Sequence, residues 1–188
     1  MLTRITILHR KDKLFMHAIA APQAQQFPAI VVKALSEWKR WGETEKGTMK
    51  RRIFDSGQSL VDKIDPHETV LMRIPRPPLL APLQVVSPLP ESDIIRALKQ
   101  LEARRALHQR NLYLAVALLP LSASFIVFPG PNVFLAYNAF RVYSNWRAAQ
   151  GATSVGQALA DPRHLIQLEP FDEALVDEET KEAFDRFK

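Results

Sequence analysis

The sequence predicts a mainly α-helical protein in which a helical hairpin is inserted into a membrane. Three observations predict this fold: a long run without charged residues, a proline corner inside that run, and arginines at both of its ends. The run extends from Asn111 to Phe140, 30 residues without Asp, Glu, Lys, Arg or His. Such a run is rare in a water-soluble domain, so we expect the hairpin to occupy residues 111–150.

A small helical or α/β unit is predicted over residues 1–74. The stretches RITILH and LFMHAIA are apolar and β-branched and are separated by the polar RKDK, so they predict a short β-hairpin. Apolar periodicity then predicts helices over residues 24–47 and 48–64, and a further short element over residues 67–74.

The next two segments are a linker and a helix. Residues 75–90 contain six prolines, which exclude a regular helix and predict an extended proline-rich linker. Residues 91–110 carry an apolar stripe and several arginines, and therefore predict a basic amphipathic helix. The final segment, residues 151–188, is an acidic C-terminal tail.

The length of the hairpin legs decides whether they cross a bilayer. A crossing needs about 20 apolar residues, with about 17 as a minimum, and Leu112 to Phe128 supplies 17. Pro120 interrupts this first leg. The alternative is a helical hairpin buried inside a soluble domain. A turn from which a second helix runs back is predicted at a membrane corner formed by Pro129, Gly130, Pro131 and Asn132.

Basic and aromatic residues gather at both ends of the hairpin. Because such residues favour one positive-rich membrane interface, we expect eight of them to contact lipid headgroups or the interface. For Arg141 and Arg147 the alternative is simple anchoring by snorkelling, without a headgroup pocket. The eight residues are Arg104, Arg105, Arg110, Tyr113, Arg141, Tyr143, Trp146 and Arg147.

The net charge of +5 is distributed unevenly along the chain. Residues 1–110 contribute +8, residues 111–152 contribute +2 and residues 153–188 contribute −5. A basic front half indicates an anionic neighbour, either lipid headgroups or nucleic acid, or else a solvated basic face. Nucleic acid is the less favoured partner, because the basic residues alternate with apolar ones at helical spacing.

No catalytic constellation stands out in the sequence. The absence of cysteine removes disulfides, thiolate metal sites and cysteine nucleophiles. The five histidines lack the spacing of metal ligands, and there is no glycine-rich phosphate loop. We therefore expect no catalytic residues, no metal and no cofactor, and a protein that is not an enzyme.

Three blocks of the sequence resemble a known family. They are WKRWGETEKGTMKRRIFDSGQSLVDKI, EARRALHQRNLYLAVALLPLS and FPGPNVFLAYNAFRVYSNWRAAQGA, of which the third is the most specific. The chain resembles the mitochondrial K+–H+ exchange-related family of inner-membrane proteins over about residues 30–155. Its corner and its proline-rich linker depart mildly from the family pattern, and its acidic tail lies outside the resemblance.

The resemblance implies a matrix-facing protein of the mitochondrial inner membrane with a link to potassium–proton balance. An ion path through a membrane needs carboxylates or histidines, and the predicted hairpin has no ionisable group before Arg141. We therefore expect an accessory protein that acts by assembly or anchoring. Its expected partners are phospholipid, such as cardiolipin, and other membrane-protein subunits. The side chains expected to pack against a partner are Trp38, Trp41, Tyr137 and Asn138.

Two other functions remain open at this point. One is a structural accessory subunit of mitochondrial ATP synthase or of a respiratory-chain complex. The other is a soluble mitoribosome-associated factor, since KRRIF and EARRALHQR combine basic and aromatic or apolar residues.

Overall fold

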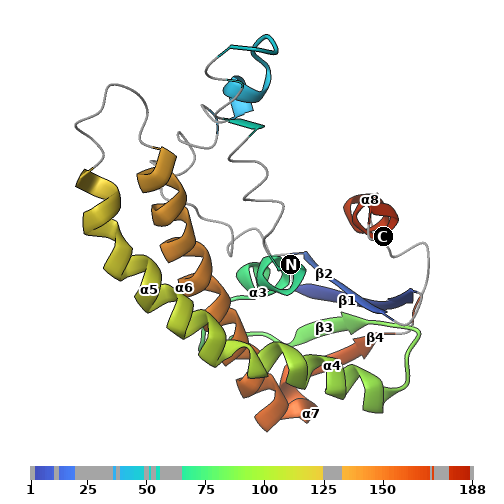
Figure 1. Cartoon of the computed structure of the whole chain (residues 1–188). Helices are drawn as coiled ribbons and strands as arrows, with labels where there is room; N and C mark the ends of the chain where they lie inside the picture. Colours follow the sequence, from blue (N-terminus) through green and yellow to red (C-terminus); the bar gives the residue numbers. More distant parts are fainter. Residues whose placement is uncertain are drawn as a thin grey trace.

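A four-stranded sheet covered by helices forms the centre of the molecule (Figure 1). The computed structural model describes residues 3–10, 13–19, 36, 39–48, 51, 54–55, 65–124, 133–169, 171 and 178–186. The elements are β1 (Arg4–Arg10), β2 (Lys13–Ile19), α3 (Pro66–Arg73), β3 (Leu83–Val86), α4 (Glu91–Ala103), α5 (Arg105–Ser124), α6 (Val133–Ala160), α7 (Pro162–Leu165), β4 (Ile166–Glu169) and α8 (Glu178–Arg186).

The strands lie in the order β2-β1-β3-β4. The predicted hairpin is confirmed, because β1 and β2 pair antiparallel, with Arg10 opposite Lys13 at its closed end. β3 pairs parallel with β1, and β4 pairs parallel with β3. These last two strands come from the predicted linker and the predicted tail, and each has only four residues. Strands this short leave too little alternation to be predicted from the sequence.

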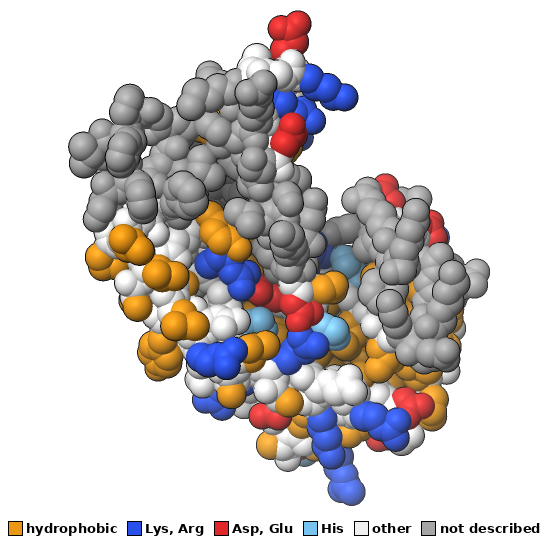
Figure 2. Space-filling view, in the orientation of Figure 1, with side chains coloured by type: hydrophobic (Ala, Val, Ile, Leu, Met, Phe, Trp, Pro, Cys, Tyr) orange, Lys and Arg blue, Asp and Glu red, His pale blue; other side chains and the backbone are white. Residues whose placement is uncertain are grey.

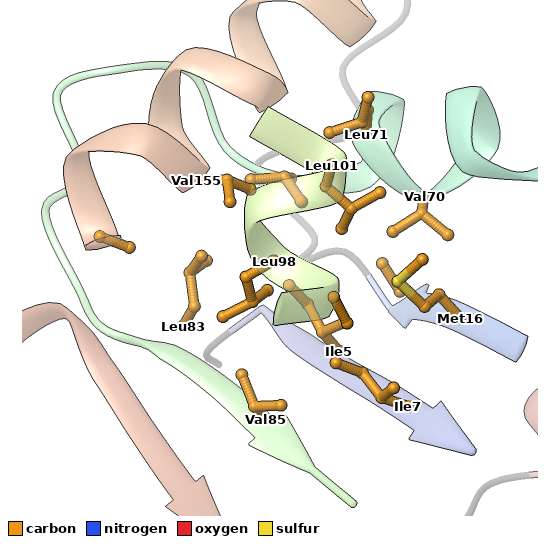
Figure 3. Packing of buried hydrophobic residues seen from close by; sticks show 14 of the residues in the cluster. Ile5, Ile7, Met16, Val70, Leu71, Leu83, Val85, Leu98, Leu101 and Val155 are labelled. Atoms are coloured by element: carbon orange, nitrogen blue, oxygen red, sulfur yellow. The ribbon is translucent and has the colours of Figure 1, made fainter. Parts of the chain in front are cut away.

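The hydrophobic core lies between one face of the sheet and the helices α3, α4 and α6 (Figure 3). Side chains alternate across a strand, so every second residue of β1, β2 and β3 points into this layer. Burial of each large aliphatic side chain stabilises the fold by about 1.5–3 kcal/mol. The core includes Ile5, Ile7, Met16, Leu83 and Val85 from the sheet and Val70, Leu71, Leu98, Leu101 and Val155 from the helices.

The opposite face of β2 packs against α8. Phe15 and His17 alternate with the core residues of β2 and are buried on this second face. The ring of Phe184 packs edge-on against Phe15, with centroids 5.3 Å apart. The Thr180 hydroxyl lies 2.8 Å from Nδ1 of His17. The acidic C-terminal helix is therefore part of the folded unit.

The predicted fold class is wrong, because the structure combines helices with a four-stranded sheet. The predicted membrane-inserted hairpin is also overturned: in the part of the chain that is described, no helix is both long enough and apolar enough to cross a bilayer. Within the described residues, the charge-free part of α5 is 14 residues, Asn111 to Ser124, short of the roughly 17 that a crossing needs. The predicted corner at 129–132 and most of the predicted helices over 24–64 lie outside the described residues.

The two legs of the predicted hairpin pack together as protein helices. α5 and α6 run antiparallel and side by side, and the Ser124 end of α5 and the Val133 end of α6 extend beyond the sheet (Figure 1). The side-chain amide of Asn138 donates hydrogen bonds to the Ala115 carbonyl at 3.0 Å and to the Ser122 hydroxyl at 3.1 Å. These bonds satisfy a buried amide and fix the register of the pair. α6 continues to Ala160, and the predicted helix over 91–110 divides at Arg104 into α4 and α5.

α6 crosses α3 at a very close distance at Gly151. A Cβ atom at this position would lie 2.0 Å from the Leu71 carbonyl oxygen, which belongs to the backbone of α3. Gly156, one and a half turns further along, is different, because its Cβ would meet only the flexible side chain of Glu102 at 3.2 Å. The close crossing therefore needs glycine at 151 and not at 156.

Substitution of these two glycines should have opposite effects on stability. Gly151→Ala should lower the free energy of unfolding by about 1–3 kcal/mol, because the helices must separate to admit the methyl group. Gly156→Ala should be neutral or stabilising by up to about 1 kcal/mol, because alanine favours the helix. Urea unfolding of the two variants measures the difference. Equal stability of the two variants would contradict the close crossing.

Candidate functional site

Charged and polar side chains gather where α3, α5 and α6 meet. Figure 2 shows acidic, basic and histidine side chains next to one another over α3. Most of these groups are buried or half-buried, so each needs a partner to offset its lost hydration. We call this group the polar cluster; it consists of Asp65, His67, Glu68, Arg104, His108, Arg141 and Asn145.

A buried ion pair joins α3 to α6. Nη1 of Arg141 donates to Oε1 of Glu68 at 2.7 Å, and only 3% of the Glu68 side chain is exposed. Glu68 lies in the first turn of α3, where the helix dipole also favours a carboxylate. The same Arg141 nitrogen lies 3.5 Å from the Ser144 hydroxyl. This pair holds α6 against the start of α3.

Asp65 serves three donors at the start of α3. Its carboxylate accepts a hydrogen bond from the His67 backbone N–H at 2.9 Å, which caps the helix. The same oxygen lies 2.7 Å from Nδ1 of His67, and the other oxygen accepts from Arg104. Burial lowers the pKa of His67 below its ordinary value. Asp65 thereby links α3 to the junction between α4 and α5.

His108 is a buried histidine on α5. The Asn145 side-chain nitrogen donates to the Arg141 carbonyl at 2.7 Å, so its oxygen faces His108 Nδ1 at 3.2 Å and accepts a hydrogen bond from it. Among the described atoms, Nε2 of His108 has no hydrogen-bond partner. Burial is the main cause that lowers the pKa of His108; Asn145 and Glu68 oppose it, while Arg104 and Arg141 add to it. The ring is therefore neutral at pH 7.

Arg147 closes the other end of α3. Its Nη2 donates to the carbonyls of Met72 at 2.8 Å and Ile74 at 3.2 Å, groups that a helix end otherwise leaves unpaired. Next to it, the Arg76 guanidinium lies over the Trp146 ring, 4.4 Å from the centroid, and the Tyr143 ring is 6.3 Å from that of Trp146. These side chains bind α6 to the chain that leaves α3.

The structure separates the eight residues predicted at a lipid interface into two groups. Arg104, Arg141 and Arg147 bind groups of the protein itself, and Tyr143 and Trp146 are half-buried beside them. Arg105, Arg110 and Tyr113 are exposed on α5.

The residues predicted to pack against a partner are also divided. Asn138 is buried against α5, and Tyr137 and Trp41 are half-buried. Trp38 lies outside the described residues, as does the corner from Pro129 to Asn132.

The sequence analysis did not single out Asp65, Glu68, His108 or Asn145. One signal points to the first two. The chain from Ala103 to Ala160 contains five arginines and no acidic residue. Any of these arginines that becomes buried must find its carboxylate elsewhere. Asp65 and Glu68 are such carboxylates, and they meet Arg104 and Arg141.

The outward surface of α5 carries a row of exposed apolar side chains (Figure 2). The exposed fractions are 73% for Tyr113, 57% for Leu114, 50% for Leu118 and 59% for Leu121. Spacings of three or four residues place these side chains on one face of the helix, while Ala115 and Ser122 are buried on the other. We call this surface the α5 outer face. It consists of the apolar row and the exposed Arg110 beside it: Leu107, Arg110, Tyr113, Leu114, Leu118 and Leu121.

The Glu68–Arg141 pair should be essential for stability. Glu68→Gln should lower the free energy of unfolding by roughly 3 kcal/mol, because Arg141 stays partly buried without a counter-charge. Adding Arg141→Met should cost less than the sum of the two single changes. The matched control is Arg96→Gln, which breaks the exposed 3.3 Å pair with Asp93 and should cost less than about 1 kcal/mol. Strict additivity in the urea-unfolding cycle would contradict the coupling.

Acidification should destabilise the fold through His108. Its pKa lies below the ordinary 6.5 in the folded protein, so below about pH 6.5 the unfolded chain binds more protons and the free energy of unfolding falls. Above that pH the group contributes no pH dependence. His108→Gln should make this loss of stability shallower in urea unfolding between about pH 5 and 7.5. Part of the loss should remain in this variant, because the lowered pKa of His67 also destabilises the fold on acidification.

His164 provides the control for this titration. It is fully exposed, and its hydrogen bond to Asp161 raises its pKa. The stability it contributes is present below about pH 6.5 and is lost as the pH rises through the folded pKa. His164→Gln should therefore not make the acid loss shallower. An identical pH profile for wild type and His108→Gln would refute the role of His108.

Comparison with known proteins identifies the family. The family model described as mitochondrial K+-H+ exchange-related matches residues 5–159, a range that includes the polar cluster, α5 and all but the last residue of α6. Searches of curated proteins and of solved structures found no match. The predicted resemblance is confirmed: the chain belongs to the mitochondrial K+-H+ exchange-related family.

Proposed function

We propose that this protein is an accessory component of mitochondrial K+–H+ exchange that acts by assembly or anchoring at the matrix face of the inner membrane. Membership of the family supports the link to exchange and to mitochondria. The observation that carries the anchoring role is the α5 outer face, an exposed apolar row on a helix pair that extends beyond the sheet. Exposed apolar surfaces of this kind mark sites of interaction.

The use of the buried charges supports a structural role for the rest of the molecule. Arg141 is bound to Glu68, Arg104 to Asp65, and Arg147 to backbone carbonyls of the α3 end. These groups fix α6 on α3 and therefore fix the position of the helix pair relative to the sheet. A rigidly held docking helix suits an anchor, because little conformational entropy is lost when it binds.

Passive swelling of mitochondria in potassium acetate tests the exchange role. Acetic acid crosses the membrane and releases its proton, and K+–H+ exchange then brings in potassium, so the matrix takes up salt and swells. Depletion of the protein should slow this swelling, and the wild-type chain should restore it. The Leu114→Asp/Leu118→Asp variant should not restore it, because two carboxylates on the α5 outer face oppose apolar docking.

Leu80→Asp is the matched control, since Leu80 is also an exposed leucine, at 95%, but lies far from the row on α5 in the sequence. It should restore swelling as well as the wild type. Swelling that is unchanged by depletion would contradict a role in exchange. Stoichiometric co-migration with ATP synthase or a respiratory complex on native gels would instead indicate a subunit of that complex.

A further inference from the structure

We infer that the α5 outer face docks on the surface of an anionic lipid bilayer, lying in the headgroup region and the upper acyl layer. The inference rests on the proposed anchoring role and names the partner. In this arrangement α5 lies parallel to the bilayer surface and contacts only one leaflet. The residues that carry it are Arg110, Tyr113, Leu114, Leu118 and Leu121.

The arrangement of side chains around α5 suits a helix that lies parallel to a bilayer surface. Spacings of seven, four and three residues place Leu107, Leu114, Leu118 and Leu121 close to one line along the helix. Arg110 and Tyr113 lie along one edge of this line. Leucine suits acyl chains, tyrosine suits the interface, and arginine suits phosphate groups.

Charge complementarity favours an anionic partner over a second copy of the chain. α5 and α6 contain no acidic residue, so pairing two α5 outer faces would leave Arg110 without a counter-charge from these helices. The arginines of the polar cluster are already bound to Asp65 and Glu68. Lipid phosphates supply the missing negative charge, and a basic residue beside an apolar helix face suits binding to an anionic bilayer surface.

Flotation of the purified full-length protein with vesicles tests the inference directly. The protein should float with vesicles of phosphatidylcholine mixed with cardiolipin, and with phosphatidylcholine mixed with phosphatidylglycerol, but weakly with phosphatidylcholine alone. Binding should fall as salt is raised, because surface charges are screened. Free inorganic phosphate at the same concentration should compete little, which separates a bilayer from a soluble anion.

Substitutions separate the contribution of charge to bilayer binding from the contribution of the apolar side chains. Arg110→Gln should weaken partitioning to anionic vesicles by about fivefold and should reduce the preference for them. Leu114→Asp/Leu118→Asp should weaken partitioning more than tenfold on every vesicle, in line with roughly tenfold per 1.4 kcal/mol. All three positions are exposed, so circular dichroism and the thermal midpoint should stay near wild type.

Matched controls use exposed residues of the same type elsewhere. Arg163→Gln on α7 and Leu80→Asp in the proline-rich segment replace exposed side chains and should leave flotation unchanged. Equal loss of binding in these controls would overturn the assignment to α5.

Three further outcomes would overturn the inference. They are no flotation on any vesicle, equal flotation on neutral and anionic vesicles, and dimerisation through the leucines in solution. Failure here is distinguishable from failure of the proposed function. If Leu114→Asp/Leu118→Asp abolishes the rescue of potassium acetate swelling while no vesicle binds the protein, the anchoring role stands and the partner is a protein.

Discussion

The contact between α3 and α6 determines how the rest of the molecule is arranged. α3 is only eight residues long, so packing and not length must hold it in place. The ion pair of Glu68 with Arg141 fixes one end of α3, and the guanidinium of Arg147 binds the carbonyls at the other end. Between them, Gly151 lets the two backbones approach closely. Loss of any one of these contacts would loosen both the core layer and the helix pair.

Burial of a charged group costs hydration free energy, and several charged groups are buried or half-buried where α3, α5 and α6 meet. A buried ion pair is weak evidence for stability, because desolvation offsets much of the attraction, although breaking it by removing one partner is costly. Its value here is geometric: α3 can satisfy Arg141 and Arg147 in only one orientation relative to α6. The polar cluster therefore specifies the position of α6, and through α6 the direction in which α5 presents its outer face.

The sequence predicts part of this architecture, and each element that it does not predict has an identifiable physical cause. The β1–β2 hairpin follows from its β-branched residues, and α4 follows from its apolar stripe. β3 and β4 are four residues each and lie in segments dominated by prolines or acids, so alternation gave no signal. The charge-free run predicts a membrane-inserted hairpin, whereas in the structure one side of α5 packs against α6, where Asn138 binds the Ala115 carbonyl and the Ser122 hydroxyl.

The arginines show which part of the candidate site a sequence pattern does not predict, namely which arginines are buried in ion pairs. Arg110 and Arg141 look equivalent in the sequence, since both border the same apolar run. In the folded chain Arg110 is exposed, whereas Arg141 meets a carboxylate 73 positions away. Such long-range pairs leave no local pattern. The excess of arginine over acid between Ala103 and Ala160 indicates only that partners are needed, and it does not say which arginines require them.

The place of β4 at the edge of the sheet bears on how the chain can be shortened. β4 pairs with β3 but begins at Ile166, beyond residue 159, where the match to the family ends. A fragment cut at that family boundary would leave β3 as an open edge, and unpaired edge strands recruit other chains into aggregates. Recombinant fragments for crystallisation or binding studies should therefore include β4 and also α8, which packs against Phe15.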